Sequence, residues 1–277
     1  MELVTLRTDD GLALDAALYQ PDDPVAAVVH LHGKGGNFYS GPGRFIPELT
    51  AKERILHLSV NMRCHDLAYT RYDVADAELS ASVTVAGGMW ERLDDGFRDV
   101  AAAVGFLRRA GHDRIFIAGH SSGGFYTADY CGRFPGEAAG RLLLSPLTAN
   151  ATAFERWFPE EGERARALAQ AEALVSEGHG HWLIPIRSWY FAVSAHSLLE
   201  RAAEPEEAWA QALAACPSPV LFLWSDAEAR DGLWQHELER FTAGPKRRVR
   251  LHGCDHQYHG SERPVAEAVA QFVHDYL

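Results

Sequence analysis

The stretch IFIAGHSSGGFYTADYCGRF, residues 115–134, sets an apolar run against a cluster of small residues and then continues in a helix-like pattern. Within it, Gly119, Ser121 and Gly123 fit the pattern G-x-S-x-G. A strand before this pattern and a helix after it place the middle serine on a strained turn at the carboxyl edge of a sheet. The flanking glycines let the two backbones approach closely. We therefore predict that Ser121 is a nucleophile and not only a turn residue that caps a helix.

A second glycine-rich loop lies upstream, in HLHGKGGNF at residues 30–38. It follows an apolar run that reads as a buried strand, so its backbone amides face the same sheet edge as Ser121. Together with the amide of Ser122, the amide of Lys34, or that of Gly35, is expected to form an oxyanion hole. The alternative, a phosphate-binding loop, is disfavoured because neither glycine-rich nucleotide pattern is matched.

A serine nucleophile needs a base, and the stretch LHGCDHQYHG at residues 251–260 offers one. His256 lies between the last expected strand and the closing helix, where a loop opens at the carboxyl edge of the sheet. His259 is the second candidate for the base. A metal site made from the histidines and Asp255 of this loop is disfavoured, since no helical H-x-x-x-H pair is present. The chemistry expected of Ser121 and His256 requires no cofactor.

Short strand-like runs alternate with helical stretches along the chain, which is typical of a mostly parallel sheet covered on both faces. The first two runs are separated by the turn residues DDG and are expected to pair as a hairpin. Helices are expected at 44–53, 90–111, from about Ser121, and at 264–277. The eight expected strands lie at 3–8, 12–19, 26–32, 54–60, 114–119, 140–146, 218–225 and 247–253.

One interval, residues 147–215, interrupts this alternation with helix-like stretches rich in Ala, Glu and Arg and with no convincing strand. The strand pattern resumes afterwards with the same character. We therefore expect a core made of residues 1–146 and 216–277, with 147–215 inserted as a helical cap. Aromatic side chains of the insertion are expected to line an apolar substrate pocket or to pack the cap on the core. The expected pocket residues are Trp157, Trp182, Trp189 and Tyr190.

Composition narrows the class of protein. The 277 residues carry a net charge of −12, which disfavours binding to nucleic acid. The four cysteines, Cys64, Cys131, Cys216 and Cys254, form no C-x-x-C pair and predict neither a zinc knuckle nor a disulfide framework. Charged residues interrupt the first stretch where a signal peptide needs an apolar run, and no run is long enough to span a bilayer. These features predict a cytoplasmic globular protein.

Taken together, HGKGG after one strand, GHSSGG after a later one, an acidic loop after VLFLW, and the pair DH near the end resemble the α/β-hydrolase family. The resemblance covers essentially the whole chain and implies an α/β fold with a mostly parallel, eight-stranded sheet. It also implies a catalytic triad in the order serine, acid, histidine. The loop NMRCHDLAY at 61–69 resembles one of the family's common loops, and we interpret its Arg63, His65 and Asp66 as structural.

The resemblance also bears on the acid of the triad. Relatives carry a glycine-aspartate-x-aspartate pattern after the corresponding strand, and reading it onto SDAEARD places Glu228 at the catalytic position. Asp226 is the alternative acid because it lies closer to the strand end, and Asp231 is a more distant one.

The activity implied is hydrolysis of a carboxylic ester, thioester or lactone of a small, apolar acyl compound. Acyl transfer, a lyase or cyclisation step on the same residues, and a non-catalytic ligand binder are the alternatives.

Overall fold

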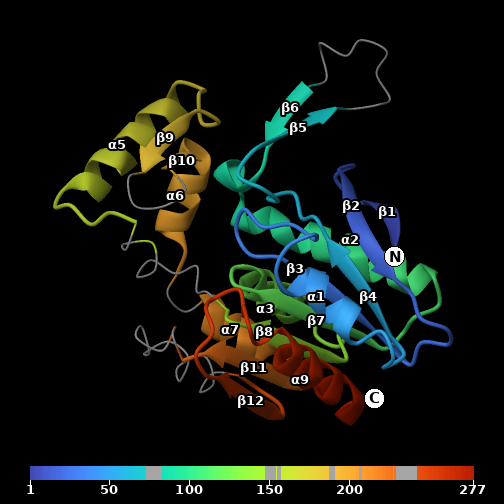
Figure 1. Ribbon diagram of the computed structural model, residues 1–277. Coiled ribbons are helices and arrows are strands. Elements are labelled where there is room, and N and C mark those ends of the chain that lie inside the picture. The colour runs from blue at the N-terminus through green and yellow to red at the C-terminus, as the bar shows by residue number, and fades with distance from the viewer. Residues whose placement is uncertain are drawn as a thin grey trace.

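A central eight-stranded sheet organises the computed structural model of the chain, with strand order β1-β2-β4-β3-β7-β8-β11-β12 (Figure 1). The structure describes residues 1–72, 83–146, 154, 157–186, 191–205, 208–226, 228 and 242–277. The strands are β1 (Glu2–Arg7), β2 (Ala13–Tyr19), β3 (Ala26–Leu31), β4 (Ile55–Val60), β7 (Ile115–His120), β8 (Gly140–Leu144), β11 (Val220–Ser225) and β12 (Lys246–Leu251).

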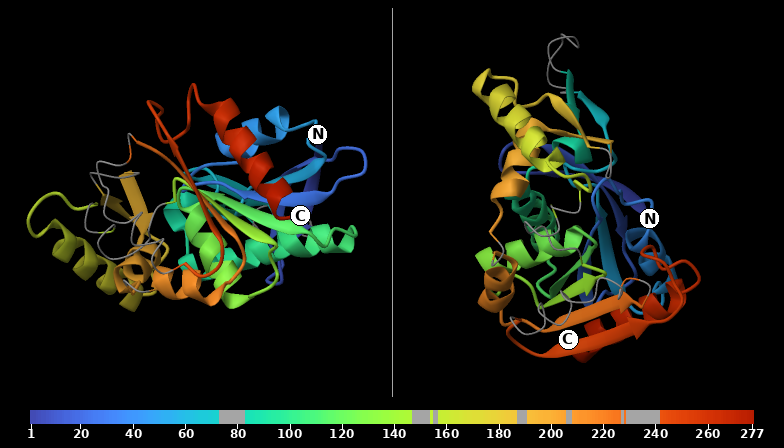
Figure 2. Two further views of the ribbon diagram at one scale, coloured as in Figure 1. Left: turned by 90° about the horizontal axis from the view of Figure 1, so that it is seen from below. Right: turned by 90° about the vertical axis from the view of Figure 1, so that its left-hand side faces the viewer.

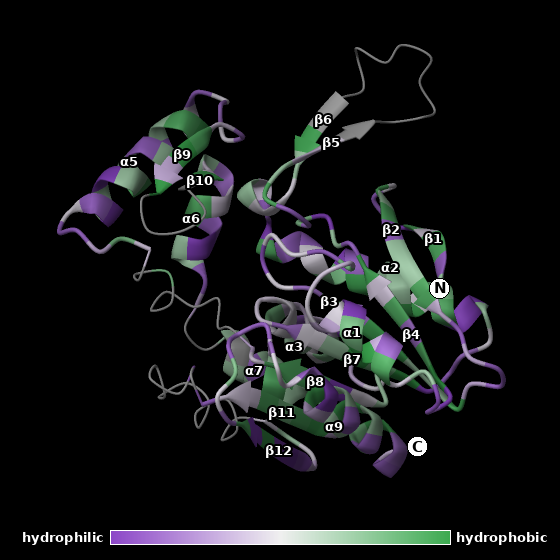
Figure 3. Ribbon diagram, viewed as in Figure 1, coloured by the Kyte–Doolittle hydropathy of each residue, from purple (hydrophilic) through white to green (hydrophobic). Residues whose placement is uncertain are grey.

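The sheet confirms the predicted pattern of pairing. β1 and β2 form the expected antiparallel hairpin, in which Glu2 pairs with Leu18 and Arg7 with Ala13. β2 is also antiparallel to β4, whereas all the remaining pairs are parallel. Every residue of β3, β4, β7 and β8 is buried, because helices cover both faces there. β12 lies at the edge and is hydrophilic (Figure 3), as suits a strand that must not pair with another chain.

Helices cover the two faces of the sheet (Figure 2). On one face lie α2 (Gly96–Arg109), α3 (Gly123–Arg133) and α7 (Ala208–Ala215). On the other lie α1 (Pro42–Leu49) and α9 (Glu262–Asp275), which pack against one another. Alternate residues of each central strand face the two apolar clusters, so that Val29 contributes to one and Val28 to the other. None of the helices in the described part of the chain has the length and apolar character that crossing a membrane requires.

Between β8 and β11 the chain leaves the sheet, as the interrupted alternation predicts. The described elements there are α5 (Glu163–Ser176), β9 (Leu183–Ile186), β10 (Phe191–Ser194), α6 (Ala195–Ala203) and then α7. The β9–β10 pair is antiparallel and was not expected from the sequence, since its runs are short and adjoin aromatic residues. A small apolar cluster of its own holds together α5, β9, β10 and α6. In contrast, α7 packs against α3, on the face of the sheet that α2 and α3 cover.

A second departure from the sequence analysis follows β4. The chain forms β5 (Tyr69–Tyr72), which pairs with β6 (Val83–Ala86) in an antiparallel ribbon that projects from the body (Figure 1). Two short 3-10 turns, η1 (Gly88–Trp90) and η2 (Leu93–Asp95), then lead into α2. Glu91 lies between these two turns and is fully buried, which matters for the site described next.

Candidate active site

Ser121 lies on the sharp turn between β7 and α3, at the carboxyl end of the sheet. Its φ of 56° is in the left-handed region that non-glycine residues rarely adopt. The amide of Ser121 donates to the carbonyl of Leu144, 2.9 Å away on the neighbouring strand, which fixes the turn to the sheet. A Cβ on Gly119 would lie 2.1 Å from the carbonyl oxygen of Gly123, so only glycine allows this approach of strand to helix. The backbone thus holds the Ser121 side chain in a strained and defined position.

The loop after β3 lies directly against this turn. A Cβ on Gly33 would come within 2.8 Å of the Ser121 Cβ, which shows how closely the loop approaches the serine. The amide of Gly36 donates to the carbonyl of Gly33 at 2.9 Å, and Gly35 has a φ of 63°, so the backbone of Lys34 sits inside a tight turn. Ser122 is the N-cap residue of α3, so its amide lies at the N-terminus of that helix, beside the loop after β3. These two backbone segments are the ones predicted to hold an oxyanion.

His256 reaches the same edge from the loop between β12 and α9. Its Nδ1 forms a hydrogen bond with a carboxylate oxygen of Glu228. The carbonyl of His256 accepts a hydrogen bond of 2.8 Å from Nε2 of His120, and the two imidazole rings lie 4.7 Å apart. Because Nδ1 is committed to the carboxylate, Nε2 is the nitrogen of His256 that remains for a proton from elsewhere.

Two further hydrogen bonds hold the Glu228 carboxylate, and a third supports one of their donors. The amide of Ser225 donates to Oε2 at 3.1 Å, and the Ser145 hydroxyl donates to the same oxygen. Tyr258 in turn donates to the Ser145 hydroxyl at 2.7 Å. Burial alone raises the pKa of a carboxyl group, but the hydrogen bonds from His256 and Ser145 outweigh it and hold the pKa of Glu228 below its usual value. Glu228 is therefore ionised at neutral pH and able to orient an imidazole.

The alternative candidates for the acid and the base lie elsewhere. Asp226 accepts hydrogen bonds of 2.9 Å from His252 and from the amide of Gly253, and so supports its own loop. His259 is exposed and pairs with Asp255 at 2.6 Å. Asp231 lies outside the described residues. Within the described ranges, no three His, Cys, Asp or Glu side chains gather as they would around a metal ion.

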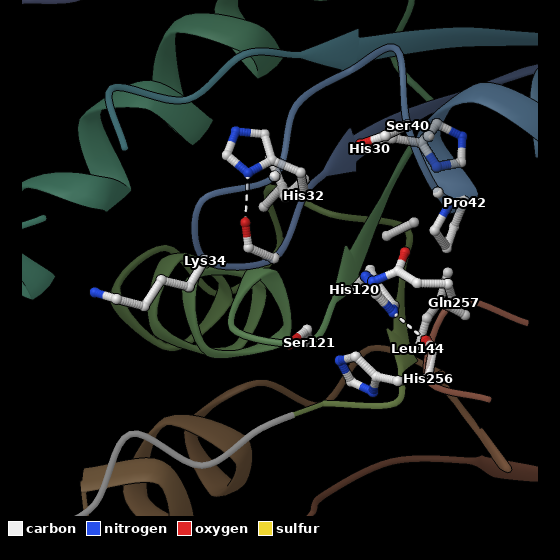
Figure 4. Close-up of a pocket in the computed structure, with 16 residues that line it drawn as sticks. His30, His32, Lys34, Ser40, Pro42, His120, Ser121, Leu144, His256 and Gln257 are labelled. Atoms are coloured by element: carbon white, nitrogen blue, oxygen red, sulfur yellow. Dashed lines mark hydrogen bonds between the residues drawn. The ribbon is translucent and has the colours of Figure 1, made fainter. Parts of the chain in front are cut away.

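Ser121 and His256 line one pocket, drawn in Figure 4, with a cavity volume of about 90 Å³. Its walls come from the loop after β3, the start of α1, the ends of β7 and β8, and the loop before α9. The imidazole of His256 lies beside Ser121, whereas the side chain of Lys34 points away from it (Figure 4). The residues that line the pocket include His30, His32, Gly33, Lys34, Ser40, Gly41, Ala118, His120, Leu144 and Gln257.

The Lys34 side chain belongs to a buried cluster of charges that the sequence did not reveal. Its Nζ donates to Glu91 at 2.7 Å and to the carbonyl of Gly88 at 2.9 Å. Arg201, on α6, forms an ion pair with the same carboxylate, and Tyr126, on α3, donates to it at 2.7 Å. Burial raises the pKa of a carboxyl group, yet the charges of Lys34 and Arg201 hold that of Glu91 well below its usual range. Glu91 therefore links the loop after β3 to the inserted segment.

The aromatic residues predicted to line a pocket have several placements. Trp157 is buried among the apolar residues of the insertion, and its ring lies 5.5 Å from Lys34 Nζ and 5.3 Å from the guanidinium of Arg201. Trp182 is half exposed and stacks on His179. Trp189 and Tyr190 lie outside the described residues. Trp157 thus packs the insertion against the charged cluster, and neither it nor Trp182 lines the pocket that contains Ser121.

The loop at 61–69 has the contacts expected of structural residues. Arg63 binds Asp99 and Asp10, both at 2.8 to 2.9 Å, and so ties the loop to α2 and to the β1–β2 hairpin. His65 and Asp66 bond to each other at 2.9 Å. The amide of Asp66 also donates to the carbonyl of Gly36 at 2.8 Å, which places the loop next to the turn that contains Lys34.

Comparison with known proteins identifies the family of this chain and several solved structures with a similar fold. A family model described as the alpha/beta hydrolase family matches residues 28–271. The fold is similar to that of Est1E from Butyrivibrio proteoclasticus with ferulic acid bound, at 16% identity and a TM-score of 0.73, covering 99% of this chain and 98% of that one.

It is also similar to DcsB in complex with a substrate analogue, at 12% identity and a TM-score of 0.76 over 100% and 99% of the two chains. A dienelactone hydrolase from Anabaena variabilis is 15% identical, with a TM-score of 0.63 over 100% and 97% of the two chains. No curated protein sequence matches this chain. At these identities the structural likeness shows the fold alone.

Proposed function

Since the chain belongs to the alpha/beta hydrolase family, we propose that it hydrolyses a carboxylic ester, thioester or lactone through an acyl-enzyme on Ser121. One observation carries the proposal. Ser121 sits on a strained turn in the same pocket as His256, whose Nδ1 is bonded to the ionised carboxylate of Glu228. This arrangement supports roles for Ser121 as nucleophile, His256 as base and Glu228 as orienting acid.

The reaction follows from this geometry. Ser121 Oγ attacks the acyl carbon while its proton moves to Nε2 of His256, and Glu228 stabilises the imidazolium through Nδ1. The amides of Lys34 and Ser122 donate to the oxyanion of the tetrahedral intermediate, which they meet at the N-terminus of α3. Collapse of the intermediate expels the alcohol or thiol, which takes the proton from His256. A water molecule then repeats the sequence on the acyl-enzyme and releases the acid.

The inserted segment is proposed to act as a cap beside this site. Two neighbouring residues of α6 dock it. Glu200 accepts hydrogen bonds from the amides of Leu93 and Asp94, at 2.9 and 3.2 Å, while Arg201 pairs with Glu91. Because Glu91 also holds Lys34, the position of the cap is tied to the turn that supplies an oxyanion amide. Est1E, a protein of similar fold, has ferulic acid bound, and a carboxylic acid is the class of product that the proposed reaction releases.

The test is a series of p-nitrophenyl esters of rising acyl length, offered to the unmodified protein and to Ser121→Ala. We expect turnover in the unmodified protein and its loss by at least three orders of magnitude in the variant, because the nucleophile is gone. Ser176→Ala removes an exposed hydroxyl of α5 and is the matched control, with turnover unchanged. Equal turnover in Ser121→Ala and in the control would refute the assignment.

A further inference from the structure

Three histidines line the pocket that contains Ser121 and are almost completely buried, namely His30, His32 and His120. The mechanism uses none of them. The side chains that line this pocket include no aspartate or glutamate within the described chain. The hydrogen bonds of the three imidazoles determine which of their nitrogens carry protons, and therefore what a bound molecule meets in the cavity.

His120 and His32 have unambiguous tautomers because each bonds to backbone groups. Nε2 of His120 lies 2.8 Å from the carbonyl oxygen of His256, which only accepts, so Nε2 carries the proton and Nδ1 is an acceptor. Nδ1 of His32 donates to the carbonyl of Gly33 at 2.7 Å, and its Nε2 accepts from the amide of Met62 at 3.0 Å. His32 has therefore used both of its nitrogens, whereas His120 has one left.

The tautomer of His30 is set by a chain of hydrogen bonds that starts at α1. Thr50 donates its hydroxyl proton to the carbonyl of Ile46 at 2.8 Å, so its oxygen must accept from Nε2 of His57, also 2.8 Å away. Nδ1 of His57 is then unprotonated and accepts from Nε2 of His30 at 2.9 Å. It follows that Nδ1 of His30, like that of His120, is an acceptor. In the part of the chain that the structure describes, neither Nδ1 has a partner.

Both imidazoles keep this state at neutral pH. Burial lowers the pKa of His30 to about 3. The pKa of His120 is also lowered to about 3, mainly by burial and to a smaller extent by the neighbouring His256. Neither ring is a cation at neutral pH, so both remain hydrogen-bond acceptors there. A ligand that fills the cavity displaces water from these acceptors, and a donor on the ligand replaces the hydrogen bond that the water made.

We propose that the group of the substrate that enters this cavity is short and carries a hydroxyl, which donates to Nδ1 of His30 or His120. This rests on the proposed function and deepens it by naming a substrate class. The volume of about 90 Å³ admits a group of only a few heavy atoms. A carboxylate could bond to neither Nδ1, and an ammonium group would find no carboxylate in the described lining; a hydroxyl can donate to either Nδ1 and needs no counter-charge.

The first experiment does not depend on turnover. Nitrogen-15 spectra of the histidine rings distinguish protonated from unprotonated nitrogens. We expect unprotonated Nδ1 in His30, His57 and His120 at neutral pH. In Ser121→Ala, titration with methyl 3-hydroxybutanoate or 2-hydroxyethyl acetate is expected to shift the Nδ1 resonance of His30 or His120, whereas methyl butanoate or ethyl acetate leaves both in place. A protonated Nδ1 on either His30 or His120, or equal responses to the hydroxylated and plain esters, would overturn the inference.

The second experiment measures selectivity in two arms. Methyl 3-hydroxybutanoate is compared with methyl butanoate, which places the hydroxyl on the acyl side, and 2-hydroxyethyl acetate with ethyl acetate, which places it on the alcohol side. We expect kcat/KM to favour the hydroxylated ester by about tenfold in one arm, as one net hydrogen bond provides. If plain esters are hydrolysed and neither arm shows a preference, the inference fails while the proposed function stands.

A matched pair of variants assigns the effect to the acceptor. His30→Asn and His30→Leu are nearly equal in size, but only asparagine places an oxygen near the position of Nδ1. If His30 is the partner of the hydroxyl, we expect the preference for the hydroxylated ester to survive in His30→Asn and to vanish in His30→Leu. If His120 is the partner, we expect the same contrast between His120→Asn and His120→Leu. Preference retained in both leucine variants would contradict the proposal.

Discussion

Replacing Glu91 by glutamine tests whether the buried charge cluster joins the inserted segment to the loop that contains Lys34. The Glu91 side chain is fully buried and pairs with both Lys34 and Arg201. Glu91→Gln keeps the shape of the side chain and removes its charge. Lys34 and Arg201 then lose the carboxylate that both of them contact, beside the ring of Trp157.

The expected loss of stability is large because the remaining charges are shielded from water. Removing one partner of a buried ion pair lowers the free energy of unfolding by about 3–5 kcal/mol. That is a substantial part of the roughly 5–15 kcal/mol by which such domains are stable. Each kcal/mol lowers Tm by roughly 2–4 °C for a chain of this size, so we expect Tm to fall by about 10 °C. Burial lowers the pKa of Lys34, so loss of its proton in the variant limits the penalty.

The assay is thermal unfolding followed by circular dichroism, with Lys34→Met as the matched control. This second variant removes the same ion pair but leaves Arg201 balanced by Glu91, so we expect it to lower the free energy of unfolding by less than about 2 kcal/mol. The contrast between the two variants isolates the charge imbalance. An equal loss in both, or a larger loss in Lys34→Met, would show that the unbalanced buried charge does not determine the loss of stability.

Three further predictions concern the triad, pH and the turn. Glu228→Gln is expected to lower kcat by roughly three orders of magnitude with folding intact, and Asp226→Asn to be much milder; the reverse ranking in steady-state kinetics would reassign the acid. Because burial lowers the pKa of His120 to about 3, below its ordinary 6.5, its contribution to stability is complete above pH 6.5 and is lost as the pH falls. His120→Asn should therefore reduce the slope of unfolding free energy against pH by about 1.4 kcal/mol per unit between pH 6 and 4, measured by urea unfolding; an unchanged slope would count against the buried neutral ring. Gly119→Ala should destabilise the fold and lower esterase activity, since its Cβ would meet the Gly123 carbonyl, whereas Gly105→Ala, which approaches only the flexible end of Arg109, should not.

The sheet was predictable from sequence because its strands are short, apolar and separated by turn residues or amphipathic helices. All eight expected runs are strands of one sheet, and the hairpin pairs as expected. The β9–β10 and β5–β6 pairs were not foreseen, because their four-residue strands carry too few residues for alternation to be read. The resemblance to the α/β-hydrolase family is confirmed by the match over residues 28–271.

In the candidate site, too, residues within local sequence motifs were predictable, whereas contacts between residues far apart in the sequence were not. Local patterns single out Ser121 and His256, and the structure places both in one pocket with Glu228 bonded to His256; their catalytic roles stay predictions. Contacts made across long separations left no local signal. Glu91 bonds to residues 57 positions before it and 110 after it, and Tyr258 supports Ser145 across 113 positions. Only the folded arrangement brings such groups together.

Trapping the covalent intermediate identifies the residue that carries the acyl group. The protein is mixed with p-nitrophenyl butanoate, quenched in acid within the first turnover, digested and analysed by mass spectrometry. We predict one butanoyl group on the peptide that contains Ser121, located at Ser121 by fragmentation, and none on that peptide in Ser121→Ala. Release of p-nitrophenol at an undiminished rate from Ser121→Ala, or an acyl group found on another residue of the unmodified protein, would show that Ser121 is not the nucleophile.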